Sequence, residues 1–291
     1  MNEHLNAIKQ NKKGGRYPFV TKADGEQEPF NAEKLASSLI HAGASKETQE
    51  KIVSHIEREI EDGTTTEEIY RHAFTLLRKG ERLPVAARYS VKRAVFELGP
   101  SGFPFERFFA EILRGHGWKT AVGVGLTGKC TPHEVDVVAT KDGKRIGVEV
   151  KFHNAPGTTT DVKDALYVHA RFEDLKLAHS ERDRVDEGWL VTNTRFTRNA
   201  IRYGQCVGLT MLGWDYPRDR GILTMVEEAQ VHPITALTTL SDGEKKRLLD
   251  SNIVLCKAIG AHQHMLEEHG IRPENIQSVL EEAKQLCGID G

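Results

Sequence analysis

The sequence predicts an α/β protein in three parts: a helical N-terminal unit with a hairpin, a central mixed sheet flanked by helices, and a small helical C-terminal region. Three observations support this fold class. Apolar residues recur at helical spacing across residues 31–99. Two runs of alternating apolar residues flank Asp142-Gly143, the strongest short hairpin signal. Short helical patterns separated by turn residues follow His232.

Composition limits the class of protein. The 291 residues are enough for two or three domains, and 38% hydrophobic with 28% charged residues is typical of a soluble globular protein. No apolar run is long enough to span a membrane. The net charge of −2 gives no overall attraction to nucleic acid, so DNA binding must come from local basic patches. The cysteines lack close spacing, which predicts free thiols and a cytoplasmic protein: Cys130, Cys206, Cys256 and Cys287.

The N-terminal unit, residues 16–99, is expected to contain a hairpin and four helices. Residues 1–15 lack apolar periodicity and are expected to be disordered. Asp24-Gly25 predicts the hairpin turn, and Thr65 with Glu68 predicts a capping box. The helices are expected from Asn31 to Ala42, from Glu47 to Glu61, from Thr65 onward, and from Pro84 to Gly99.

The opening of this unit resembles the ATP-cone, the regulatory nucleotide-binding domain of ribonucleotide reductases and their repressors. The matching residues are Val20, Lys22, Asp24, Gly25, Glu28, Asn31 and Lys34. The resemblance implies that ATP or dATP binds, with the two lysines on phosphates and Val20 and Glu28 holding the base. Ala23 departs from the pattern, because many members have Arg or another polar residue there. The full predicted nucleotide site is Val20, Lys22, Glu28, Asn31, Lys34, Thr66 and Arg93.

The nucleotide is expected to act as an effector, because the chain contains no GxxxxGK[ST] P-loop for hydrolysis. The alternative is a helical bundle that does not bind nucleotide.

The central hairpin carries the candidate chemistry. With Asp142-Gly143 as a two-residue turn, Val138 faces Gly147, Asp136 faces Glu149 and Glu134 faces Lys151. One face is apolar, and the other carries these four charged residues. Facing carboxylates are unfavourable, so Asp136 and Glu149 predict a hard cation, Mg²⁺ or Mn²⁺, between them. Lys151 points the same way and could hold a phosphate or an attacking water. The alternative is a solvated, functionless charged face. The expected core residues are Val135, Val137, Ala139, Ile146, Val148, Val150 and Phe152.

The helix from Pro104 to Arg114 is expected to precede the hairpin. Its apolar stripe is Phe105, Phe108, Phe109, Ile112 and Leu113. At 100° per residue, Glu106 lies at the border of this stripe and Glu111 lies away from it. Glu106 is therefore the acid expected to reach the hairpin.

A helix from Asp161 to Ala178, a strand from Trp189 to Thr192, a basic helix from Arg195 to Gln205 and a strand from Val207 to Leu212 are expected next. The inward residues of the first helix are predicted as Val162, Ala165, Leu166, His169, Phe172 and Leu175. This alternation predicts a mixed sheet with helices on both faces.

The order of elements over residues 103–215 resembles the PD-(D/E)xK nuclease fold, and most closely its Mrr-like restriction endonuclease branch. The resemblance implies a Mg²⁺-dependent endodeoxyribonuclease of the type IV restriction class that acts on DNA. Asp136, Glu149 and Lys151 match the metal-binding acids and the catalytic lysine, and Glu106 matches an acid of the first helix. Val135 replaces the proline of the motif name.

Other residues are less specific. Arg195 and Arg198 could bind DNA phosphates or could form a solvated basic face. Zinc is a weak alternative at His116, Cys130, His133 and His153, since only Cys130 and His133 are closely spaced.

Residues 231–291 are expected to form short helices broken at residues 241–243 and a final helix from Pro273 to Gly288. They predict a helix-hairpin-helix-like or dimerisation element.

The sequence therefore predicts three domains, at residues 16–99, 103–230 and 231–291. The predicted function is a metal-dependent DNA endonuclease regulated by ATP or dATP, and a homo-oligomer is expected. The alternative is a non-catalytic, ATP-sensing DNA-binding regulator on a nuclease fold.

Overall fold

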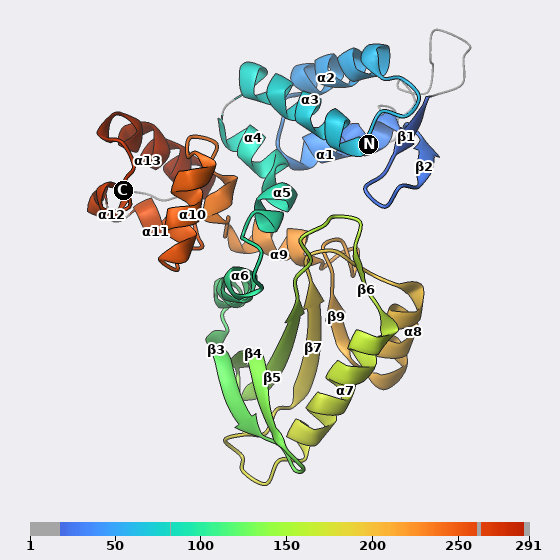
Figure 1. Ribbon diagram of the computed structural model, residues 1–291, viewed down its shortest axis with the longest axis vertical. Coiled ribbons are helices and arrows are strands. Elements are labelled where there is room, and N and C mark those ends of the chain that lie inside the picture. Colours follow the sequence, from blue (N-terminus) through green and yellow to red (C-terminus); the bar gives the residue numbers. More distant parts are fainter. Residues whose placement is uncertain (1–17, 82, 261–262, 288–291) are drawn as a thin grey trace. The chain divides into compact units, whose positions relative to one another are not determined.

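The computed structural model describes residues 18–81, 83–260 and 263–287 (Figure 1). The segment 1–15, expected to be disordered, and Gly288 lie outside the described residues. The chain divides into two compact units, Met1–Val91 and Lys92–Gly291, and each is described by itself. No described helix is both long enough and apolar enough to cross a membrane.

The first unit is a short hairpin followed by four helices. Asn31 caps the first helix by accepting from the Lys34 N–H at 3.1 Å. The predicted capping box of Thr65 and Glu68 is present. A bridge between Thr21 and Thr65 joins the hairpin to the start of the third helix. The elements are β1 (Phe19–Thr21), β2 (Gln27–Pro29), α1 (Ala32–His41), α2 (Lys46–Glu59), α3 (Thr66–Gly80) and α4 (Leu83–Tyr89).

The helix predicted from Pro84 to Gly99 is wrong as a single element. The structure has two helices there, α4 and α5 (Val91–Phe96), which are separated at Ser90. The Ser90 hydroxyl donates to the Ala87 carbonyl at 2.8 Å, a local bond that competes with the helical backbone. The division between the two units falls beside this break, after Val91.

The second unit contains a five-stranded mixed sheet of order β3-β4-β5-β7-β9. β3, β4 and β5 pair antiparallel, and β5, β7 and β9 pair in parallel, so the sheet is mixed, as the sequence predicts. The strand β3 was not predicted from the sequence, because Gly123 and Gly125 weaken the strand signal. The strands are β3 (Lys119–Thr127), β4 (Pro132–Lys141), β5 (Lys144–Lys151), β7 (Glu187–Thr192) and β9 (Thr210–Leu212).

The predicted hairpin turn is confirmed. Asp142 and Gly143 have φ of 51° and 78°, and Val138 pairs with Gly147. The face that the sequence assigns to the core is buried from Val135 to Val150, with Phe152 partly buried at its end.

Helices cover both faces of the sheet (Figure 1). On one face, α6 (Phe103–Gly115) places the Phe105 ring 5.5 Å from the Phe152 ring. On the face that carries Glu149, α7 (Val162–Lys176) inserts Phe172 where β5 and β7 have Gly147 and Gly188. A Cβ at either glycine would lie 2.4 or 2.2 Å from the Phe172 ring, so only glycine leaves room for it. The helix α8 (Arg198–Val207) packs on the same face as α7.

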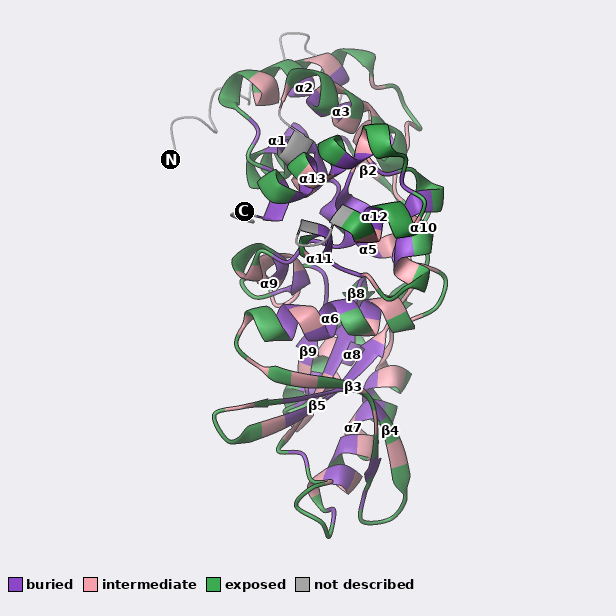
Figure 2. Ribbon diagram, turned by 90° about the vertical axis from the view of Figure 1, so that its left-hand side faces the viewer, coloured by how far each residue is buried: buried purple, intermediate pink, exposed green. Residues whose placement is uncertain are grey.

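Figure 2 shows buried and exposed residues alternating along α6 and α7. The whole predicted stripe of α6 is buried. In α7 the prediction is wrong in part: Val168 is buried, whereas Leu166 is 47% exposed. The stripe of α7 is Ala165, Val168, Phe172 and Leu175.

The basic helix predicted to begin at Arg195 begins three residues later, because Thr197 is its N-cap. Arg195 instead lies in the short strand β8 (Arg195–Phe196), which pairs in parallel with β6 (Thr159–Thr160).

The rest of the second unit is helical. Ser241 caps α10 with a capping box, so the predicted break at residues 241–243 is a helix start. Glu282 of α13 is buried and accepts four hydrogen bonds from the backbones and hydroxyls of Thr238 and Thr239. The elements are α9 (Ile222–Ala229), the 3-10 helix η1 (Ile234–Ala236), α10 (Asp242–Asp250), α11 (Lys257–Gly260), α12 (Gln263–Glu268) and α13 (Pro273–Cys287).

The prediction of free thiols is wrong for one pair. Cys256 and Cys287 form a disulfide, whereas Cys130 and Cys206 are free. The partners are 31 residues apart, so their spacing in the sequence gave no sign of their proximity.

Candidate functional site

The candidate site lies where the β4–β5 ladder ends. The last pair of residues in the β4–β5 ladder is Val137 and Val148, and Asp136 and Glu149 are the next residues along the two strands. There the Asp136 carboxylate accepts the Val150 N–H at 2.7 Å. The side chain of Asp136 is thus held by the backbone of the neighbouring strand.

Glu149 is only 5% exposed, which excludes the solvated charged face for this residue. Its Oε1 accepts from Lys151 Nζ at 2.8 Å, and its Oε2 accepts from Arg171 Nη1. A buried carboxylate is strongly unfavourable unless it is paired. Lys151 and Arg171 supply that pairing, one to each oxygen of Glu149.

Arg171 of α7 is a site residue that the sequence analysis missed. It also donates to the Glu134 carbonyl at 3.1 Å and to the Tyr167 hydroxyl at 2.6 Å, and its guanidinium lies 4.8 Å from the Tyr167 ring centre. A signal was present: Arg171 follows Val168 by three residues and precedes Leu175 by four, so it lies on the buried stripe of α7.

The pKa values of three charged residues at the site are raised. Burial, followed by repulsion from Asp136 and Glu149, raises the pKa of Glu106 to about 7. Burial, followed by repulsion from Glu149, raises the pKa of Asp136 to about 6. Burial alone would lower the pKa of Lys151, but the hydrogen bond and charge of Glu149 outweigh it and raise that pKa. Glu106 thus lies within electrostatic reach of the hairpin acids.

A buried amide anchors the chain just after Lys151. The Asn193 side chain accepts from the His153 N–H at 2.8 Å and donates to the His153 carbonyl at 2.9 Å. The His153 ring bonds to the Thr160 hydroxyl at 2.9 Å, and burial lowers its pKa. His153 is therefore a neutral anchoring residue. Nothing in the sequence pattern singled out Asn193.

The structure does not bring together the residues of the zinc alternative. His116 bonds to the Met225 carbonyl, His133 pairs with Asp174 at 2.8 Å, and His153 bonds to Thr160. Within the described parts of the chain, these histidines and Cys130 form no metal-ligating cluster.

In the first unit, the two predicted phosphate-binding lysines converge on one acid. Lys22 Nζ lies 3.3 Å and Lys34 Nζ 2.8 Å from the Glu28 carboxylate. The hydrogen bond from Lys34 is the main reason that the pKa of Glu28 is lowered. Val20 is buried beside them in β1.

The other residues predicted to bind nucleotide, and the two predicted to bind DNA, lie on separate elements. Asn31 is occupied as the α1 N-cap, and Thr66 opens α3. Arg93 belongs to the second unit, where it pairs with Glu97 at 3.2 Å. Arg195 and Arg198 are both exposed, in β8 and at the start of α8.

Most of the chain matches known protein families. The model of the ATP cone domain matches residues 18–95, and the restriction endonuclease model matches residues 100–212. Residues 232–287 match the model described as AF1548-like, C-terminal. An uncharacterized protein of Archaeoglobus fulgidus is 36% identical over 180 residues, which cover 62% of this chain and 99% of the relative. The chain belongs to the AF1548-like family.

Among solved structures, a protein of unknown function, AF1548, is 33% identical with a TM-score of 0.54, and the match covers 65% of this chain and 99% of that one. The MspJI restriction endonuclease in complex with a 27-mer oligonucleotide is 16% identical with a TM-score of 0.32, and the match covers 80% of this chain and 48% of that one. Both resemblances seen in the sequence are confirmed: this AF1548-like protein carries an ATP-cone domain and a restriction endonuclease domain.

Proposed function

We propose that this AF1548-like protein is a metal-dependent DNA endonuclease whose ATP-cone binds ATP or dATP as an effector. One observation carries the proposal: Asp136 of β4 and Glu149 of β5 lie just beyond the last pair of these adjacent strands, and Lys151 Nζ lies 2.8 Å from Glu149. The restriction endonuclease family match supports phosphodiester hydrolysis as the reaction. The type IV, Mrr-like class is part of the proposal.

The residues fit a divalent cation. Burial, and then repulsion among the neighbouring acids, raises the pKa of Asp136 to about 6 and that of Glu106 to about 7. A dication would relieve this repulsion, and carboxylate oxygens are the ligands that Mg²⁺ and Mn²⁺ take. Asp136 and Glu149 would hold the ion, with Glu106 beside them. When bound, it supplies Lewis-acid polarisation of the scissile phosphate.

The side chains around the ion have distinct tasks. Lys151, held by Glu149, presents a positive Nζ that orients the attacking water or stabilises the negative charge developing on the phosphate. Glu106 can exchange a proton near neutral pH, because its pKa is about 7. Arg171 fixes the orientation of Glu149 from the opposite side. Arg195 and Arg198 would contact DNA phosphates outside the reacting position.

The nucleotide proposal rests on the pair of lysines at Glu28. Lys22 and Lys34 lie beside a hairpin and a helix start, where polyphosphate would replace the carboxylate as their partner. ATP or dATP can bias cleavage only by binding two states of the protein with different affinity.

The test is cleavage of supercoiled plasmid by the full chain in Mg²⁺ or Mn²⁺, with and without ATP or dATP, while oligomeric state is followed by light scattering. Lys22→Ala with Lys34→Ala should abolish the nucleotide effect and keep basal cleavage. Lys46→Ala with Lys51→Ala, a change of two exposed lysines on α2, is the matched control. ATP consumption that depends on Lys22 and Lys34 would contradict the effector role.

One observation favours the second candidate function, a non-catalytic ATP-sensing DNA-binding regulator. Both oxygens of Glu149 are engaged by Lys151 and Arg171, so its charge is balanced by the protein's own cations. Such a regulator would bind DNA and leave the plasmid intact in both metals.

A further inference from the structure

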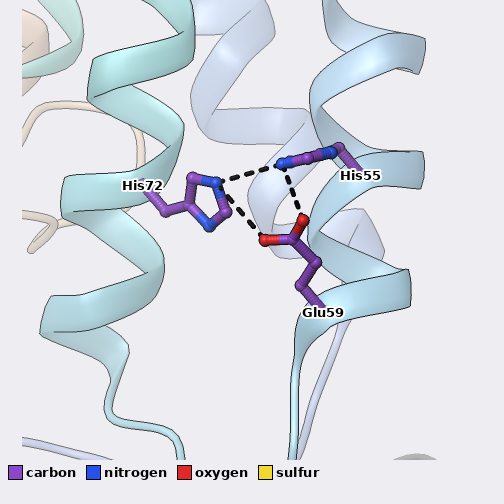
Figure 3. Close-up of side chains that lie close together, drawn as sticks. All are labelled: His55, Glu59 and His72. Carbon is purple, nitrogen blue, oxygen red and sulfur yellow. Dashed lines mark hydrogen bonds and ion pairs between the residues drawn. The ribbon is translucent and has the colours of Figure 1, made fainter.

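Three metal-ligating side chains that are not among the residues proposed to bind nucleotide meet in the first unit. His55 and Glu59 are one helical turn apart on α2, and His72 faces them from α3 (Figure 3). The His55 and His72 Nε2 atoms are 3.1 Å apart. Glu59 places one oxygen 3.2 Å from His55 Nε2 and the other 3.6 Å from His72 Nε2. All three donor groups therefore converge on one small volume.

The spacing of these atoms is that of ligands around a metal ion. With bonds of about 2.0–2.1 Å, a tetrahedral zinc ion requires ligand atoms about 3.3 Å apart. The Nε2–Nε2 separation of 3.1 Å lies close to that value. Glu59 approaches the two rings with different oxygens, at 3.2 and 3.6 Å, and with one oxygen as the ligand all three ligand atoms lie within 4.8 Å of one another. A hydrogen bond between the rings would require His55 and His72 to adopt different tautomers, because only one proton fits between the two Nε2 atoms. A metal accepts a lone pair from both nitrogens.

We propose that His55, Glu59 and His72 form a binding site for a divalent transition metal, with Zn²⁺ as the fitting ion. Imidazole nitrogens with one carboxylate suit zinc, cobalt or nickel, whereas Mg²⁺ and Ca²⁺ prefer oxygen ligands. Three protein ligands leave a fourth position for water or a small ligand. The side chains are 33%, 53% and 37% exposed, so the ion can enter from solvent.

The ion would join α2 to α3 next to the hairpin of the same unit. Glu59 is the last residue of α2, and the loop that follows binds β1: Asp62 accepts the Phe19 N–H at 2.6 Å, and the Gly63 N–H bonds to the Phe19 carbonyl at 2.8 Å. Metal binding should therefore stabilise the helix pair and the loop that supports β1.

The test uses the full chain without a histidine tag, stripped with chelator, in the Asp136→Asn background to remove the other candidate metal site. Zn²⁺ is titrated by calorimetry, and Co²⁺ is followed by visible absorption, which distinguishes tetrahedral sites from octahedral ones. The parent should bind Zn²⁺ and give a tetrahedral Co²⁺ spectrum. His55→Gln and His72→Gln should each weaken binding by more than about tenfold.

His41→Gln, which changes an exposed histidine of α1, should leave binding unchanged. Circular dichroism checks that each variant is folded, and the Co²⁺ spectrum of the parent tests the site even if a variant unfolds. Three results would overturn the proposal. The first is an octahedral Co²⁺ spectrum of the parent, and the second is a Co²⁺–thiolate absorption band that persists when His55 is replaced. The third is unchanged Zn²⁺ affinity in both folded glutamine variants.

Discussion

Asp136 lies on β4, and Asp174 of α7 bonds to His133 of the same strand. The two aspartates have opposite electrostatic environments. Asp174 bonds to the His133 ring, and it accepts the Cys130 and Thr131 N–H groups at 2.8 and 3.3 Å. These bonds, with that of His133 the largest, lower its pKa to about 2. Asp136 accepts one backbone N–H, and burial with nearby Glu149 raises its pKa to about 6. Burial beside a second carboxylate, against a set of hydrogen-bond donors, thus separates an aspartate suited to bind a cation from one that holds structure.

The largest expected effect is on cleavage by Asp136→Asn. Loss of a proposed metal ligand should lower plasmid cleavage by about 10³-fold or more and abolish the rise in melting temperature caused by Mg²⁺. Stability without metal should stay the same or increase, because a repelling charge is removed. Unchanged melting temperatures across a millimolar-range Mg²⁺ titration in both proteins would refute the metal site.

Lys151→Ala separates chemistry from binding. Cleavage should fall by roughly 10²–10³-fold, because a positive group beside the reacting phosphate is lost. DNA affinity, measured by fluorescence anisotropy, should stay within a few-fold, since one phosphate contact among many is modest. Lys144→Ala, at the exposed start of β5, is the matched control. Parental cleavage by Lys151→Ala would remove the nuclease assignment from this site.

Asp174→Asn should produce the reverse pattern. The Cys130 and Thr131 N–H groups would lose a charged acceptor, so the melting temperature should fall by roughly 2–4 °C. Cleavage by the folded protein should not change. Glu173→Gln, its exposed neighbour, should have little effect on either quantity. A loss of cleavage without a loss of stability would show that Asp174 belongs to the reactive group.

The smallest expected effect is on the pH dependence of stability without metal. The pKa values of Asp136 and Glu106 are higher in the folded protein than their ordinary 3.8 and 4.5. The folded state then binds more protons, so their contribution to the free energy of unfolding falls as pH rises from about 4 to about 7. The pKa of Asp174 is lowered instead, so its contribution is full above about pH 4 and is lost toward pH 2.

Urea unfolding at a series of pH values tests these opposite signs. Asp136→Asn should gain stability relative to the parent as pH rises through 6. Asp174→Asn should differ most from the parent at neutral pH and least in acid. Parallel curves for all three proteins would contradict the comparison.

Local signals predicted much of the fold. The Asp142-Gly143 turn, the Thr65 capping box and the apolar stripe of α6 each depend on residues a few positions apart, and the structure has all three. The misses have other causes. The glycines of β3 weaken the signal of a strand that pairs with β4, and the helix breaks at Ser90 although the apolar pattern continues. The Cys256–Cys287 disulfide joins residues brought together only by helix packing.

The same distinction applies to the site. The sequence could place Asp136, Glu149 and Lys151 together because one hairpin carries them, and their roles stay predictions. Arg171 meets Glu149 across 22 residues, and Asn193 meets His153 across 40. Such partners depend on how α7 and β7 pack against the hairpin, which periodicity alone does not specify.

Gly147 and Gly188, which contact Phe172, can be used to compare this chain with related sequences. The Phe172 ring packs against Gly147 and Gly188, and Arg171 is the preceding residue of the same helix. How closely α7 approaches the sheet therefore sets how close Arg171 comes to Glu149. A larger residue at position 147 or 188 would push α7 outward. A homologue that retains the acids and the lysine but lacks either glycine would then lose the arginine partner of its buried glutamate. A search for relatives with this same arrangement around the glutamate should therefore require both glycines as well as the acids and the lysine.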